Sequence, residues 1–174
     1  HPDQNSFMLV YNGNRIFTDN GYAKAYTRDH NTLTINGAGQ YYEGSEHSDW
    51  QTSDAKYANP SIKVFESCED YLYAVGDATE SYEQNSRLQK YERHFVFLKP
   101  DVLVVLDNAN LEWWSLNSEL KTNFFTPLTY SETNSDGSFS FQNSDVKMNV
   151  FTVGNGSASV QNLDRTISKN GTTE

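Results

Sequence analysis

The chain has 174 residues, enough for one domain with a buried core, and its 11 Tyr and 10 Phe are typical of sheets rather than helical bundles. Its net charge of −10 argues against a nucleic-acid partner, because phosphate neutralisation needs clustered Lys and Arg. No apolar run approaches the length of a membrane span, and no signal peptide is recognisable.

The opening forty residues concentrate the strongest local signals. Two strand-like segments, 6–11 and 14–19, flank Asn12-Gly13, which is the strongest short-range signal for a type I′ hairpin turn. The later stretch 40–60 is polar and aromatic and predicts a long loop. Loops of that length in compact domains are usually functional.

The rest of the chain predicts short strands separated by turns. Strand-like segments occur at 31–36, 61–66, 71–76, 90–98, 102–107, 112–120, 124–130, 137–142, 145–153 and 157–163. Even spacing of short strands is the pattern of an all-β sandwich or barrel. Residues 102–107 are apolar on both faces, which predicts a central strand. We therefore predict a single β domain over 1–174, with a frayed tail from about 165–174.

Three residues of the opening stretch form a candidate metal site. His1, Asp19 and His30 are two imidazoles and a carboxylate, a standard zinc set that leaves a fourth position open. Spacing alone favours the plainer alternative, in which His1 is a loose terminal residue and His30 lies on a surface loop. Five extended residues would span roughly 16 Å, so His1 reaches Asp19 only if residues 1–5 bend back.

Two pairs of residues have both a chemical and a plain interpretation. Tyr22 and Tyr26 could act as general base and acid beside a cation, once the phenol pKa falls from about 10. Packing in a sheet is nevertheless the default for any tyrosine of this chain. His47 and Trp50, in the predicted long loop, could contact a sugar ring or simply lie at the surface.

Small polar residues lie beside the candidate ligands. Asp3, Gln4 and Asn31 fit a second set of residues that orients imidazoles through hydrogen bonds, or they cap turns. Trp113 and Trp114 are adjacent within a predicted strand, where one ring is expected in the core and the other outside.

The order of these motifs resembles a known family. HPDQNSF, DNGY, HNT and GAGQ follow one another over residues 1–40 as they do in the C-terminal domain of the heparinase II/III-like polysaccharide lyases, a group that includes alginate and oligo-alginate lyases. A second stretch is similar as well: DYLYAVGDATESY, then YERHFVFLKPDVLVVLD, then WWSLNSE. The resemblance extends over approximately residues 1–120.

The resemblance implies a fold, a reaction and a site. In the family an antiparallel β-sandwich packs against an N-terminal (α/α) toroid, which residues 1–174 lack. The reaction is β-elimination on a uronic acid: a base removes the proton at C5, the carboxylate is neutralised, and an acid protonates the departing O4 oxygen. His1, Asp19 and His30 match the family's zinc ligands, with zinc bracing the sandwich, and Tyr22 or Tyr26 match its candidates for facing substrate.

The implied partner is an acidic uronate polysaccharide or oligosaccharide, and the implied location is periplasmic or secreted. A net charge of −10 opposes such a partner, so we expect the cations for substrate to come largely from the toroid. The isolated fragment is expected to be inactive, because it holds half of the cleft. The alternatives are a non-catalytic carbohydrate-binding or structural module and a plain adhesion sandwich whose histidines are incidental.

Overall fold

The described part of the chain is built from strands. The computed structural model describes residues 1–19, 26–41, 43, 59–82, 87–115, 117–154, 156–161, 168–169 and 172–173. Within those residues every strand pairing is antiparallel, the only helical segments are short 3₁₀ turns, and no α-helix is present. The predicted all-β antiparallel fold is confirmed. None of these segments is a helix long and apolar enough to cross a membrane.

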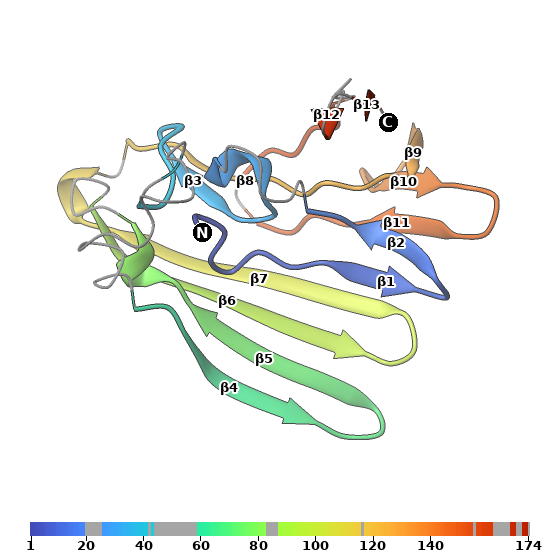
Figure 1. Cartoon of the computed structure of the whole chain (residues 1–174), viewed down its shortest axis with the longest axis horizontal. Coiled ribbons are helices and arrows are strands. Elements are labelled where there is room, and N and C mark those ends of the chain that lie inside the picture. Colours follow the sequence, from blue (N-terminus) through green and yellow to red (C-terminus); the bar gives the residue numbers. More distant parts are fainter. Residues whose placement is uncertain are drawn as a thin grey trace. The chain divides into compact units, whose positions relative to one another are not determined.

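The chain divides into two compact units, His1–Pro127 and Leu128–Glu174. The strands of the first unit, labelled in Figure 1, are β1 (Leu9–Tyr11), β2 (Asn14–Phe17), β3 (Leu33–Ile35), β4 (Ser61–Ser67), β5 (Tyr71–Asp77), β6 (Leu88–Leu98), β7 (Val102–Leu111) and β8 (Leu120–Thr122). Its 3₁₀ turns are η1 (Thr27–Asp29), η3 (Thr79–Ser81) and η5 (Trp113–Ser115). Those of the second are β9 (Thr129–Thr133), β10 (Phe139–Gln142), β11 (Lys147–Val150), β12 (Ser168–Lys169) and β13 (Thr172–Thr173). Most of the predicted frayed tail, 165–174, lies outside the described residues.

The largest sheet of the first unit has four strands in the order β4-β5-β6-β7 (Figure 1). Its two long hairpins place Gly76, Arg93 and Asp107 directly opposite one another on β5, β6 and β7. Residues paired across antiparallel strands share a face of the sheet. The sheet therefore presents a glycine, a guanidinium and a carboxylate side by side on one face.

Strand β7 lies at the edge of this sheet, not at its centre. Three of its apolar side chains are exposed on the other face of the sheet, Val102 at 49%, Val104 at 47% and Leu106 at 60%. The prediction of a central strand over 102–107 is therefore wrong. An apolar run on both faces does not require burial on both faces, because the described residues leave one face of this strand to solvent.

The tryptophan pair also differs from the expectation. Trp113 and Trp114 open the turn η5 instead of continuing a strand, and both rings are exposed, at 75% and 53%. Their rings meet edge to face with centroids 5.3 Å apart. Because a turn lacks the alternation of a strand, neither ring is directed into the core.

The hairpin predicted at the start of the chain is present. Strands β1 and β2 pair antiparallel through Asn12 and Gly13, whose φ angles of 49° and 77° are the positive values that a type I′ turn requires. The register shifts between Leu9 and Val10, and Leu9 is the first residue of β1 that pairs with β2. The residues before Leu9 are thereby released from the ladder and can turn toward the sheet.

The core of the first unit lies between β3 and the four-stranded sheet. It consists of Leu33, Ile35, Ala78, Tyr82 and Tyr91. The Tyr82 hydroxyl donates a 2.6 Å hydrogen bond to the carbonyl of Leu33. Burial raises the pKa of Tyr82 to about 12, so its hydroxyl stays protonated and remains a donor. Strand β3 thus packs against Tyr91 of the sheet and is bonded to the residue that follows η3.

The second unit has a three-stranded sheet in the order β11-β10-β9 and a short β12-β13 pair. Ser140 on the central strand is 1% exposed, and its hydroxyl donates to Asn149 Oδ1 at 2.8 Å while accepting from Asn134 Nδ2 at 2.9 Å. Ring contact between Tyr130 and Phe141 adds apolar packing. This unit contains no residue of the predicted site.

Gly76 provides a test of how tightly the opening segment packs on the sheet. A Cβ added at Gly76 would collide with Asn5 Oδ1, and the Asn5 amide donates a 3.0 Å hydrogen bond to the Gly76 carbonyl. We expect Gly76→Ala to lower the free energy of unfolding by about 1–3 kcal/mol through overpacking and the lost bond. Gly156→Ala is the control, since nothing lies within 4 Å of its added Cβ. Equal denaturant midpoints for the two variants would contradict this packing.

Candidate metal centre

The first five residues bend back instead of extending β1. The amide of Asp3 donates to the carbonyl of His1, and the amide of Ser6 donates to the carbonyl of Asp3, both at 2.9 Å. Asn5 completes the bend with a φ of 61°, a left-handed conformation that asparagine tolerates better than most residues. The bend that any contact between His1 and the hairpin requires is therefore present.

Side chains from later segments hold this bend through the backbone of Gln4. The Gln4 amide donates to Gln40 Oε1 at 2.8 Å, and the Gln4 carbonyl accepts from Gln40 Nε2 at 2.9 Å and from Thr32 Oγ1 at 2.8 Å. Gln40 is 3% exposed and Thr32 is fully buried. A buried amide side chain that satisfies both backbone groups of one residue fixes that residue as a strand partner would.

The second segment of the site follows the turn η1. The amide of His30 closes this turn by donating to the Thr27 carbonyl at 3.1 Å, and the His30 and Asn31 side chains are fully buried. Asn31 then binds three parts of the chain. Its Nδ2 donates to the carbonyls of Phe7 and Thr18, each at 2.8 Å, and its Oδ1 accepts from the amide of Phe125 at 2.6 Å.

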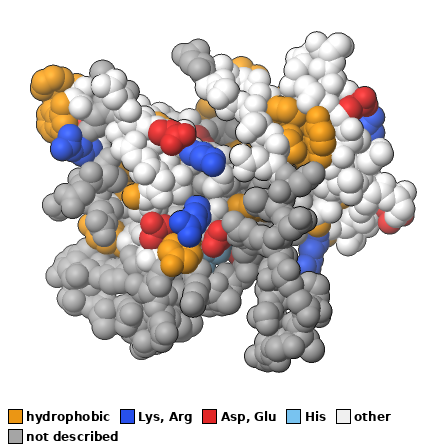
Figure 2. Space-filling model, turned by 90° about the horizontal axis from the view of Figure 1, so that it is seen from above, with side chains coloured by type: hydrophobic (Ala, Val, Ile, Leu, Met, Phe, Trp, Pro, Cys, Tyr) orange, Lys and Arg blue, Asp and Glu red, His pale blue; other side chains and the backbone are white. Residues whose placement is uncertain are grey.

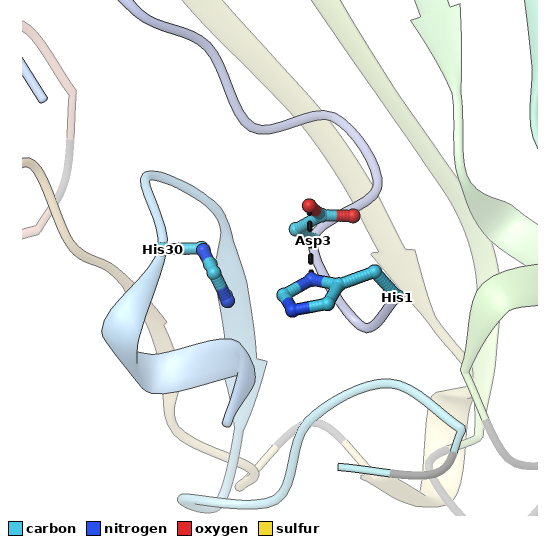
Figure 3. A group of neighbouring side chains, drawn as sticks. All are labelled: His1, Asp3 and His30. Atoms are coloured by element: carbon cyan, nitrogen blue, oxygen red, sulfur yellow. Dashed lines mark ion pairs between the residues drawn. The ribbon is translucent and has the colours of Figure 1, made fainter. Parts of the chain in front are cut away.

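These two segments bring His1, Asp3 and His30 together (Figure 3). Each offers a ligand atom, and these atoms all lie within 4.8 Å of one another. His1 Nδ1 lies 2.9 Å from Asp3 Oδ2, and the two imidazole rings meet edge to face with centroids 4.7 Å apart. Among the described residues this is the one group of three or more His, Cys, Asp or Glu side chains that could share an ion.

Asp19 contacts His30 but is not part of that group. Its Oδ2 lies 2.5 Å from His30 Nδ1 and accepts a 3.4 Å hydrogen bond from Ser6. Two ligand atoms on one tetrahedral zinc are about 3.3 Å apart. Asp19 therefore contacts His30 Nδ1 directly, with no ion between the two atoms, and Nε2 is the ring nitrogen of His30 that could bind one.

Two observations show that these residues fit a divalent cation. His30 Nε2 is fully buried and has no hydrogen-bond partner among the described residues. A buried nitrogen of this kind costs stability unless a ligand satisfies it. In addition, burial raises the pKa of Asp3, and the nearby His30 offsets this only in part. A cation between His1 and His30 would satisfy the nitrogen and stabilise the carboxylate, and imidazole with carboxylate suits zinc.

The remaining predicted site residues are distributed as follows. Gln4 and Asn31 support the two segments of the site, as described above. Tyr26 lies just before η1, where the Arg28 guanidinium stands 4.4 Å from the centre of its ring. The other three, Tyr22, His47 and Trp50, lie outside the described residues.

Sequence reasoning gave no role at the site to the residues beneath it. Arg93 is fully buried and donates to the carbonyls of Asn5 and Asn31, at 2.8 Å for the former. Its Nε and Nη2 bind the two oxygens of Asp107 at 2.6 and 2.8 Å. One signal could have found Arg93: it alternates with Tyr91 and Phe95 along a predicted strand, so all three side chains share one face. A charge on the buried face of a strand needs a charged partner, which indicates a buried ion pair.

The sequence itself matches the family described as "Heparinase II/III-like, C-terminal" over residues 1–112. This match covers the hairpin, both segments of the site and strands β4 to β7. The chain belongs to this family, as its order of motifs predicts. Membership groups the chain with the C-terminal domains of heparinase-like polysaccharide lyases.

Asn31 provides a test of the site's framework. Asn31→Ala leaves the carbonyls of Phe7 and Thr18 and the amide of Phe125 without their side-chain partner. We expect a loss of about 2–4 kcal/mol in the free energy of unfolding. Asn123→Ala removes one exposed bond, to the Arg28 carbonyl, and should cost under about 1 kcal/mol. Denaturant unfolding measures both, and similar losses would show that Asn31 is not a structural centre.

Proposed function

We propose that this chain is the β-sandwich domain of a lyase that cleaves uronic-acid-containing polysaccharide by β-elimination. The observation that carries the proposal is the convergence of His1, Asp3 and His30, with Asp19 against His30, inside the region that matches the heparinase-like family. The substrate would be an acidic polysaccharide or oligosaccharide, and the protein would work in the periplasm or outside the cell.

We further propose that zinc binds here and braces the sandwich. His1 and His30 would be its imidazole ligands, His30 through its unsatisfied Nε2, and Asp3 its carboxylate ligand. Asp19, which the sequence offers as the carboxylate ligand, would instead hold the His30 ring through Nδ1 at 2.5 Å. A bound zinc would supply charge that fixes these side chains in place. The chain's own residues do the rest: Gln40 and Thr32 hold the bend that carries His1, and Asn31 holds the segment that carries His30.

The acid and base of the reaction would come from both sides of a cleft. A toroid preceding this domain would supply most of the groups that neutralise the uronate carboxylate. From the sandwich, Tyr26 is the described candidate for facing substrate, with the Arg28 guanidinium over its ring. The net charge of −10 supports this division. On the face seen in Figure 2, acidic and basic side chains of the described residues lie next to one another.

A second candidate function is a non-catalytic carbohydrate-binding module. The observation that favours it is the exposure of Trp113 and Trp114, at 75% and 53%, since exposed aromatic surface is often functional. Such a module would bind polysaccharide without cleaving it. The activity assay below distinguishes the two functions.

Metal analysis tests the zinc site. We expect the purified protein to retain one zinc per chain after dialysis, and His30→Ala to lose it because the ring is a ligand. His94→Ala is the matched control, since the His94 ring bonds Tyr73 on the neighbouring strand β5 and is not part of the site. Asp3→Asn should weaken zinc binding more than Asp19→Asn, because Asp19 would act only through the His30 ring. A wild-type protein without bound metal, or a His30→Ala protein with full occupancy, would contradict the zinc proposal.

Lyase activity tests the function. The intact gene product should produce unsaturated uronate, seen as new ultraviolet absorbance, on at least one of alginate, heparan and chondroitin. Residues 1–174 alone should give none, because the cleft needs the toroid as well. Binding without turnover by the intact protein on every uronate polymer would support the module instead, and turnover by the fragment would contradict the division of catalytic groups.

A further inference from the structure

We propose that Arg93 is a positioning residue for the metal centre: its guanidinium fixes the distance between the two chain segments that carry the imidazoles. The inference rests on the proposed zinc site. It goes beyond that site because Arg93 touches none of the candidate ligands and would act only through the backbone.

Arg93 bonds one backbone carbonyl in each of the two segments that carry the imidazoles. Arg93 Nη1 donates to the carbonyl of Asn5, at the end of the bend that carries His1, and to the carbonyl of Asn31, which directly follows His30. One nitrogen therefore joins Asn5 and Asn31, which lie 26 residues apart in the sequence. The distance between those carbonyls, and with it the separation of the two imidazoles, depends on where Nη1 lies.

A fixed anchor sets the position of Nη1. The other two nitrogens of the guanidinium bind both oxygens of Asp107, in a fork that allows little rotation. Asp107 Oδ2 also accepts a 3.0 Å hydrogen bond from Thr122 on β8, the strand that pairs with β3. The guanidinium is thus held from the sheet side and directs its remaining nitrogen at the site.

The charge of Arg93 is secure although the side chain is fully buried. Burial, the largest single effect, would lower the pKa of Arg93, but the hydrogen bonds to Asp107 and the electrostatic interactions with Tyr91, Asp107 and Tyr82 together outweigh it and raise the pKa. A permanently charged donor binds carbonyl oxygens more strongly than a neutral one. Lysine could not replace it, because a single ammonium cannot bind both carboxylate oxygens in a fork and reach two carbonyls as well.

The test measures zinc affinity in the full-length protein by competition with a chelating dye. Arg93→Lys keeps the charge and removes the fork, so we expect zinc affinity to fall about 10- to 100-fold, the usual loss when a residue that orients ligands is changed. Cobalt(II) should give an altered visible spectrum in this variant, since the ligand geometry changes as well. Arg15→Lys, an exposed position on β2, is the matched control and should leave affinity and spectrum unchanged.

The outcomes separate this inference from the function proposed above. If the wild-type protein binds no zinc, the proposed zinc site fails, and with it the basis of the inference. If the wild type binds zinc and a folded Arg93→Lys protein binds it equally well with an unchanged cobalt spectrum, the inference alone is overturned. Circular dichroism and thermal unfolding establish that each variant is folded.

A measurement on the wild type decides the question if the Arg93 variant does not fold. Coupling between two sites is reciprocal, so a guanidinium that tightens zinc binding must itself be held more firmly when zinc is bound. We expect hydrogen exchange at Arg93 Nε to slow severalfold when zinc is added to protein stripped by a chelator. The exposed Arg15 should show no such change. Equal exchange at Arg93 with and without zinc would overturn the inference.

Discussion

The first unit depends on one buried ion pair. Arg93 and Asp107 face each other on β6 and β7, and the guanidinium continues from there to the carbonyls of Asn5 and Asn31. A buried pair of this kind is weak support for stability in itself, because desolvation of both charges offsets their attraction. Its effect here is to fix geometry. Removing Asp107 would leave the buried charge of Arg93 without its partner. The intact pair joins the sheet, the opening bend and the segment after η1 at one point.

Around that point, the site is held by hydrogen bonds to the backbone more than by contacts between its own side chains. Gln40 and Thr32 bind Gln4, Asn31 binds Phe7 and Thr18, and Asn5 lies against Gly76, where any larger residue would collide with it. The imidazoles are thus placed by polar groups on segments far from them in sequence. Such a framework suits a centre whose task is to hold a domain face in shape, since the ligands are positioned before any ion binds.

Local sequence signals predicted much of this architecture, and long-range pairing accounts for what they missed. Asn12-Gly13 predicts its hairpin because asparagine and glycine adopt positive φ angles readily, and this preference depends on no distant part of the chain. Apolar residues on both faces of segment 102–107 predict a central strand, but they do not reveal whether another strand pairs on each side of it. The candidate ligands His1, Asp19 and His30 stood out by residue type, yet the presence of Asp3 among them depends on a bend set by Gln40. The role of Arg93 follows from its position opposite Gly76 and Asp107, a register that no local pattern specifies.

The spacing of the contacts made by Arg93 also bears on the order in which the molecule assembles. Its bond to Asp107 closes a separation of 14 residues, whereas those to Asn31 and Asn5 close separations of 62 and 88. Because the entropy lost on closing a loop grows with its length, we expect the β6-β7 hairpin to form early and the opening segment to dock late. The group formed by His1, Asp3 and His30 would then exist only after the sheet is complete, so a metal would lock a finished fold in place without guiding the chain toward it.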